Sequence, residues 1–163
     1  MQAAKKPGAK APDRLACGCA GTQVRTLAQE EAGQDAPAQP GRLQNWPVQL
    51  QLVPVRAPYF DGCDLLIAAD CTAYACGSFH ADFIRGHVTL IGCPKLDRAD
   101  YEEKLTAILM ENNVRSITLT RMEVPCCGGL EYAARQAVEA SGKSIPMRVV
   151  TFMADGKLLP QDA

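Results

Sequence analysis

Residues 64–71, DLLIAADC, are the stretch that decides the fold of this chain. Its five consecutive apolar residues leave no polar face, which is typical of a strand covered on both sides in a parallel sheet. HVTLIGC at 87–93 has the same character. SITLTRMEV at 116–124 is a third apolar run, and MRVVTFM at 147–153 reads as a closing strand. An earlier stretch, NWPVQLQLVP at 45–54, alternates apolar and polar residues and predicts a half-buried strand.

Helical patterns separate these strands. Asp100 and Glu103 resemble a capping box that opens one helix, and Gly142 is placed to end another. The apolar residues of these two helices recur at helical spacing, and they are Tyr101, Leu105, Ile108 and Leu109 in the first and Leu130, Ala133, Ala134, Ala137 and Val138 in the second. A shorter helix is expected over 78–86. The alternation predicts an α/β fold with a mostly parallel, doubly wound sheet and flanking helices.

Composition divides the chain in two. Residues 1–43 are rich in Ala, Gln, Pro and Gly and predict a flexible arm that carries a CGC element at Cys17 and Cys19, whereas 44–163 predict the cysteine-rich α/β domain. The 17 basic and 18 acidic residues nearly cancel, which gives no general attraction to nucleic acid or to a membrane surface. Because no apolar stretch reaches the roughly 20 residues that span a bilayer, we expect a cytoplasmic protein.

Four of the eight cysteines follow strands of the predicted sheet. Cys71 comes after the strand at 64–70, Cys93 after the next, and Cys126 with Cys127 after the third. Since parallel strands end on the same side of a sheet, we expect these four thiols to lie together above the crevice where such folds bind ligands. The other cysteines of the domain are Cys63, expected to be structural at the opposite end, and Cys76, which with His80 is a weaker ligand candidate.

Four converging thiols suit either a tetrahedral zinc ion or an iron–sulfur cluster. A disulfide between Cys126 and Cys127 is disfavoured because adjacent Cα atoms lie closer, at about 3.8 Å, than the usual range for bridged cysteines. Gly128 and Gly129 would let the backbone approach a bulky ligand at the start of a helix. Lys95, two residues after Cys93, is expected over the same crevice, where its charge would offset that of the thiolates.

Several ordered blocks of this sequence resemble a widespread prokaryotic group of iron–sulfur cluster-binding proteins described as ferredoxin-like. The blocks are WPVQLQLVP, DLLIAADCTAYA, FHADFIRG, LIGCPKLD and RMEVPCCGGL, and the similarity covers roughly 43–159. The resemblance implies a [4Fe-4S] cluster held by Cys71, Cys93, Cys126 and Cys127. Many members of the group also carry an N-terminal CxxCxxC module and a cysteine-proline-glycine-serine element. This chain has no CxxCxxC, and CGCAGTQVRTL at 17–27 stands in the place of the second element.

The sequence thus predicts an iron–sulfur protein that transfers electrons or senses redox state together with a separate redox partner protein. Two alternatives stay open, a zinc-stabilised interaction module and a metal-free thiol oxidoreductase with Cys126 or Cys127 as a nucleophile of low pKa. The chain has no GxGxxG, P-loop, HExxH or GxSxG motif, so the sequence makes no case for substrate turnover.

Overall fold

The structure, a computed structural model, describes residue 27 and residues 40–160. Its centre is a sheet of four strands that all run parallel, in the order β2-β1-β3-β4. The strands are β1 (Asp64–Ala69), β2 (Val88–Gly92), β3 (Ser116–Met122) and β4 (Met147–Phe152). The predicted α/β fold with a parallel, doubly wound sheet is confirmed.

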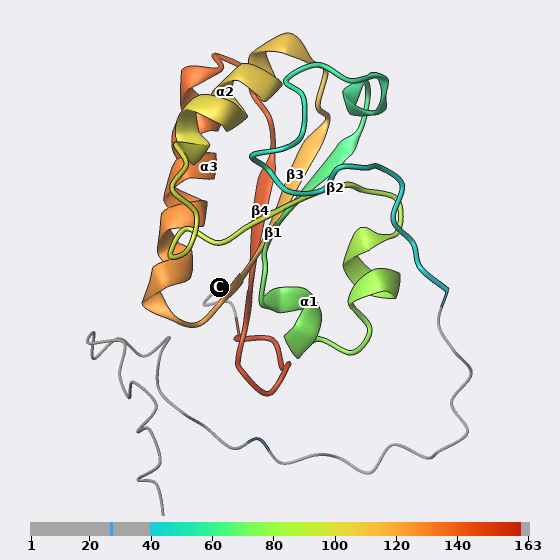
Figure 1. The fold of residues 1–163 in the computed structure, drawn as a ribbon, viewed down its shortest axis with the longest axis vertical. Helices are drawn as coiled ribbons and strands as arrows, with labels where there is room; N and C mark the ends of the chain where they lie inside the picture. The colour runs from blue at the N-terminus through green and yellow to red at the C-terminus, as the bar shows by residue number, and fades with distance from the viewer. Residues whose placement is uncertain (1–26, 28–39, 161–163) are drawn as a thin grey trace, which may run out of the picture.

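The connections between strands carry the helices. These are α1 (Thr72–Ala75), α2 (Tyr101–Glu111) and α3 (Gly128–Ala140), with 3-10 turns η2 (Pro58–Phe60) and η4 (Pro125–Cys127) and a π-helical turn η3 (His80–Ile84). Figure 1 shows α2 and α3 on one face of the sheet, with α1 and η3 on the other. This is the arrangement that right-handed crossovers produce when the chain leaves β1 for β2 and then returns past β1 to β3.

The core lies on both faces of the two central strands. Leu65, Leu66 and Ile67 in β1 and Ile117 and Leu119 in β3 are each at most 1% exposed. Burying a side chain of this size stabilises the fold by roughly 1.5–3 kcal/mol. The unbroken apolar runs of the sequence therefore reflect strands that have no solvent-facing side.

The helix boundaries follow the predicted signals. The side chain of Asp100 caps α2, because its Oδ1 accepts the backbone N–H of Glu103 at 3.0 Å. The other end of α2 is held by Lys143, whose Nζ donates to three of the last carbonyls of α2 and its cap, including that of Leu109 at 2.6 Å. Gly142 follows the end of α3 with a φ of 68°, the left-handed conformation expected of a helix stop.

One predicted strand is wrong, and one predicted helix is shorter than expected. Residues 45–54 do not form a strand: only Gln49 bridges to Ile91 of β2, and the chain then turns, with the N–H groups of Leu52 and Val53 both donating to the carbonyl of Gln49. Leu52 consequently lies 71% exposed and not on a buried face. The short helix predicted over 78–86 is present as the π-helical turn η3, which is shorter than expected, and in it the ring of Phe83 packs against those of Phe79 and Phe152.

Candidate functional site

The four cysteines that follow the strands lie at the carboxyl end of the sheet, as predicted. Cys93 comes directly after β2, and Cys71 is the residue at the N-cap position of the short α1 after β1. Cys126 and Cys127 form most of η4 after β3. Because β1 lies between β2 and β3, the three loops are neighbours. We call these four residues the thiol site. Cys71 and the Cys126–Cys127 pair flank the point between β1 and β3 where the direction of winding reverses, which is the usual ligand position in this kind of sheet.

The thiols of the site differ in burial and influence one another. Cys71 is exposed, Cys93 and Cys126 are half-buried, and Cys127 is buried. Burial, with smaller contributions from the nearby Cys126 and Cys71, raises the pKa of Cys127 to about 11. Burial also raises the pKa of Cys71, with added repulsion from Cys93, Asp70 and Cys126. Thiols from three separate loops are therefore close enough to affect each other's ionisation.

These thiols do not surround a point that a single ion could occupy. In the residues that the structure describes, no three His, Cys, Asp or Glu side chains come together closely enough to hold one metal ion. A tetrahedral zinc site needs four sulfurs each about 2.3 Å from the metal, so the sulfurs themselves must nearly touch.

The glycines after the cysteine pair start α3, as the sequence predicts. Gly129 allows close contact with Pro94 in the loop after β2, since a Cβ at this position would lie 3.3 Å from the Cβ of Pro94. The approach that Gly129 permits is thus between two loops of the protein. Around Gly128 the nearest side-chain atom would be 4.0 Å away, on Arg121, which leaves more room. Lys95 is exposed beside Pro94 in the loop that carries Cys93.

An ion-pair network spans the turn that holds Cys126 and Cys127. Arg121 in β3 contacts Glu131 in the first turns of α3 at 2.7 Å, and both side chains are only about one-fifth exposed. Arg135 approaches the other oxygen of the same carboxylate at 2.9 Å. Burial alone raises the pKa of Glu131, but the hydrogen bonds from Arg121 and Arg135 outweigh it and hold the pKa below its usual value. The network therefore connects β3, which precedes the turn with Cys126 and Cys127, to α3, which follows it.

Three further polar residues lie at the same end of the sheet, and the sequence prediction missed them. Asp97 accepts the backbone N–H of Cys93 at 3.1 Å and the hydroxyl of Tyr101. Gly92 makes room for this tyrosine, because a Cβ there would be 2.6 Å from its hydroxyl oxygen. Asp70 precedes Cys71, and its Oδ1 is buried with no hydrogen-bond partner. Burial, followed by repulsion from Asp97, raises the pKa of Asp70. The strand-end rule that selected the cysteines would also have selected Asp70.

The weaker candidates lie elsewhere. Cys63 is buried just before β1, at the amino end of the sheet, and burial raises its pKa to about 11. Cys76 lies beyond α1 with its Sγ 3.7 Å from the Ser78 hydroxyl. His80 accepts the backbone N–H of Arg42 through Nδ1 at 3.1 Å. Cys17 and Cys19 lie outside the described residues, as does nearly all of the predicted arm at 1–43.

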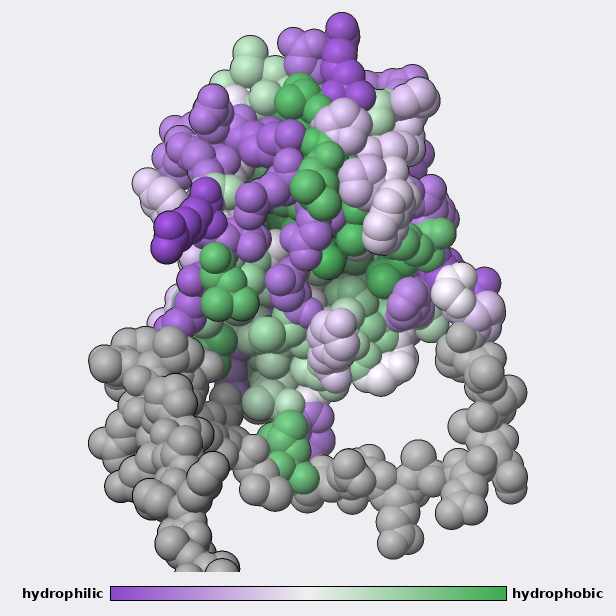
Figure 2. Space-filling model, in the orientation of Figure 1, coloured by the Kyte–Doolittle hydropathy of each residue, from purple (hydrophilic) through white to green (hydrophobic). Residues whose placement is uncertain are grey.

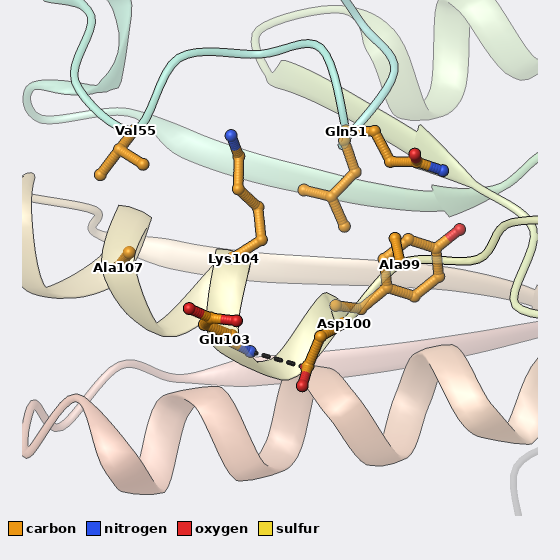
Figure 3. A pocket seen from close by; sticks show the side chains of 9 residues that line it. Gln51, Val55, Ala99, Asp100, Glu103, Lys104 and Ala107 are labelled. Carbon is orange, nitrogen blue, oxygen red and sulfur yellow. Dashed lines mark hydrogen bonds between the residues drawn. The ribbon is translucent and has the colours of Figure 1, made fainter.

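The cavities on the part of the chain that the structure describes include three of similar size. One of about 390 Å³ lies between α2 and the 50–55 loop, and Figure 3 shows Lys104 of α2 extending toward that loop, with Glu103 and Asp100 beside it. A second of about 490 Å³ lies between the 94–102 segment and Gly129 with Ala133 of α3. The third, of about 350 Å³, lies beside Asp70. None of these three has a cysteine of the thiol site in its lining.

Fold and topology define the chain as a Rossmann-like α/β protein. Residues 57–163 match the Rossmann-like domain family, and the chain belongs to it. A protein of Archaeoglobus fulgidus, described only as uncharacterized, is 31% identical over 119 residues, which cover 72% of this chain and 84% of that protein. No solved structure gives a significant match. The resemblance to iron–sulfur proteins remains a prediction of the sequence.

Among the residues that the structure describes, no helix is both long and apolar enough to cross a membrane.

Proposed function

We propose that this protein binds a [4Fe-4S] cluster through Cys71, Cys93, Cys126 and Cys127 and transfers single electrons to or from a partner oxidoreductase, or senses redox state through the cluster. One observation carries the proposal: the loops that follow three neighbouring parallel strands each contain cysteine, and together they carry four thiols at the end of the sheet where this fold binds ligands. When bound, such a cluster supplies reversible one-electron chemistry.

The chemistry of the donor set fits a cluster. Cysteine binds iron as the thiolate, yet the thiols of Cys71 and Cys127 have raised pKa values because of burial and their sulfur neighbours. Several iron ions supply the positive charge that such a group of thiolates lacks. A multi-iron cluster is also larger than one ion, so its ligands can stand further apart than those of a zinc site.

The surface around the thiol site is suited to a protein partner. Tyr74, three residues after Cys71, is 93% exposed, and Leu96, three residues after Cys93, is 77% exposed. In Figure 2 the lower end of the described surface, where the strands end in Figure 1, is mainly green and white, whereas the upper part over α2 is mainly purple. Exposed apolar side chains beside a redox group favour transient protein contact.

The metal-free alternative has less support. A reactive cysteine needs a lowered pKa, and a buried thiol whose pKa is about 11 is protonated at neutral pH. The raised pKa of Cys127 therefore gives no support to this residue as the nucleophile of the alternative, and Cys126 is the better candidate of the two.

Anaerobic purification followed by metal and sulfide analysis tests the proposal. We expect brown protein with broad absorption near 400 nm and about four iron and four sulfide per chain. Dithionite should bleach this absorption reversibly and produce an electron paramagnetic resonance signal. Colourless protein with about one zinc per chain would establish the zinc module instead. Protein without either metal, in which Cys126 is alkylated rapidly, would support thiol chemistry.

A further inference from the structure

The loop that carries Cys93, residues 93–97, is closed on itself by hydrogen bonds. The carbonyl of Cys93 accepts the N–H groups of Leu96 at 3.0 Å and of Asp97 at 2.8 Å. In the other direction, the N–H of Cys93 donates to Oδ2 of Asp97 at 3.1 Å. Both backbone polar groups of Cys93 are therefore used within its own loop, and the side chain of Asp97 supplies one of the partners.

The Asp97 side chain is also anchored outside the loop. Its Oδ2 accepts the hydroxyl of Tyr101, the first residue of α2. This tyrosine is only 5% exposed, and its ring lies against Gly92, where a Cβ would be 2.6 Å from the hydroxyl oxygen. The hydrogen bond from Tyr101, together with that from Cys93, outweighs burial and holds the pKa of Asp97 below its usual value. Asp97 is thus a carboxylate at neutral pH that connects the loop to α2.

The loop places Cys93 beside Cys71. Gly92 pairs with Ala69 in the sheet, and its carbonyl accepts the N–H of Asp70 at 3.2 Å, so the residues just before the two cysteines are bonded to each other. Cys93 also contributes to the raised pKa of Cys71. A change in the 93–97 loop would therefore move two of the four thiols relative to each other.

We propose that Asp97 is a positioning residue of the thiol site, which holds Cys93 beside Cys71 and whose negative charge keeps the reduction potential of the bound cluster low. The effect on the potential rests on the proposed function, whereas the positioning of Cys93 does not. A cluster becomes more negative when it takes up an electron, and a carboxylate bonded to the backbone of one of its ligands opposes this change. Hydrogen bonds to the sulfurs of a cluster have the opposite effect, and Asp97 withholds the N–H of Cys93 from such a bond.

The first test uses the full chain, treated with a chelator so that its thiols are unbound. The rate at which iodoacetamide alkylates Cys93 is measured by mass spectrometry of the peptide that contains it. We expect Asp97→Ala to raise this rate at least about fivefold, because the loop opens more often once the hydrogen bond to Cys93 is lost. An unchanged rate in Asp97→Ala would overturn the proposal.

Two controls separate the hydrogen bond from other effects on the rate. Asp97→Asn removes the same charge, but its amide oxygen can still accept the N–H of Cys93, so its rate should stay within about twofold of that of the unmodified protein. Cys63, buried at the amino end of the sheet, should react equally slowly in all variants, which excludes general unfolding. A rate at Cys93 that rises as much in Asp97→Asn as in Asp97→Ala would overturn the positioning role.

The second test measures the reduction potential of the anaerobically purified protein by a titration followed by electron paramagnetic resonance. Asp97→Asn should favour the reduced form at least about threefold, or roughly 30 mV upward for one electron, because the charge is lost while the loop stays closed. Glu102→Gln is the matched control, since it removes an exposed carboxylate from the first turn of α2, where solvent screens the charge. Equal shifts in the two variants would overturn the proposal.

The two tests also distinguish failure of this proposal from failure of the proposed function. Unmodified protein that contains no iron would overturn the proposed function and, with it, the effect of Asp97 on a potential. The alkylation rates would then still decide whether Asp97 positions Cys93. Protein that contains the cluster but shows neither change would overturn the role of Asp97 alone.

Discussion

The polar groups at the two ends of the sheet differ in whether they have hydrogen-bond partners within the protein. At the amino end, Asp64 accepts the Ser116 hydroxyl at 2.8 Å and contacts the Arg115 guanidinium at 2.5 Å, while the backbone N–H of Arg115 donates to the carbonyl of Cys63. At the carboxyl end, an oxygen of Asp70 is buried without a partner, and Cys71 is exposed near other thiols.

This difference indicates that the amino end of the sheet contributes to stability and that the carboxyl end is available for binding. Groups that satisfy one another, as around Asp64, contribute to folding and have little left to offer a ligand. Groups that lack partners, as around Asp70, reduce stability unless something else binds them. The carboxyl end of this sheet therefore carries the features of a functional site, and the following experiments can break or sharpen the contrast.

The largest effect is expected at the thiol site. Serine at Cys71, Cys93, Cys126 or Cys127 should each lower the iron content per chain by at least about tenfold, because each removes one thiolate ligand. Cys76→Ser, in the segment between α1 and η3, and Cys63→Ala, at the amino end, should both keep the iron. Iron analysis of anaerobically purified variants measures this. Loss of iron in Cys63→Ala but not in Cys93→Ser would mean that iron is bound at the amino end of the sheet and not at the carboxyl end.

The next effect concerns packing at the carboxyl end. In Gly92→Ala the new methyl group would meet the Tyr101 hydroxyl at 2.6 Å, so the ring must move and its contact with Asp97 is disturbed. We expect a loss of about 2 kcal/mol in the free energy of unfolding, measured with urea. Gly77→Ala is the control, because a Cβ there has no neighbour within 4 Å, and it should change stability by less than about 0.5 kcal/mol. Equal effects of the two substitutions would contradict the packing described for Tyr101.

A smaller effect is expected for the network across the cysteine turn. Glu131→Gln removes the charge that Arg121 and Arg135 share and should cost about 1 to 2 kcal/mol of unfolding free energy at pH 7. Glu139→Gln replaces an exposed residue later in α3 and should stay within about 0.5 kcal/mol of the unmodified protein. The free energy of unfolding of both variants is measured with urea at low and at high salt. If the two variants lose the same stability, the network does not stabilise the turn.

The smallest effect is a dependence on pH at the amino end. The hydrogen bond from Ser116, together with that from Arg115, holds the pKa of Asp64 below its ordinary value. A lowered pKa in the folded state stabilises the protein above the unfolded pKa of about 3.9, and this contribution is lost as the pH falls through the folded pKa. Because the pair is partly exposed, the contribution is at most about 1 kcal/mol.

Asp64→Asn should therefore show a smaller decrease in stability between neutral pH and acid than the unmodified protein, in urea unfolding at a series of pH values. Ser116→Ala should reduce the decrease in the same direction, since it removes the hydrogen bond that contributes most. An unchanged pH profile in Asp64→Asn would mean that this carboxylate is not a stabilising group.

Much of this fold was predictable because strands buried on both faces leave a strong signal. The runs that became β1 and β2 have almost no polar residues inside them, and the order of these strands and β3 along the chain already placed Cys71, Cys93 and Cys126 on one side of the sheet. The failure at 45–54 has a physical cause, since alternating residues are equally compatible with a strand and with a segment that turns after one bridge. Here the turn at Gln49 decided the outcome.

The surroundings of the thiol site were harder to predict than the cysteines themselves. The pairing of Asp97 with Tyr101, and the space that Gly92 leaves for it, depend on how α2 lies against β2. The cavity of about 350 Å³ beside Asp70 depends on a segment that begins more than forty residues before β2 along the chain. Such contacts between distant segments have no local signature in the sequence.

The two outer strands of the sheet are covered by irregular segments of the chain. The Asn45 side chain and the Val48 carbonyl bond to the backbone of β2, and on the opposite side Leu158 bridges to Phe152 of β4 while the N–H of Leu159 donates to Thr151. An uncovered strand presents free N–H and C=O groups to any other chain and invites aggregation. Asn45 and Leu159 thus protect the edges of the sheet from pairing with other chains. A truncated chain that lacks either residue would be prone to self-association.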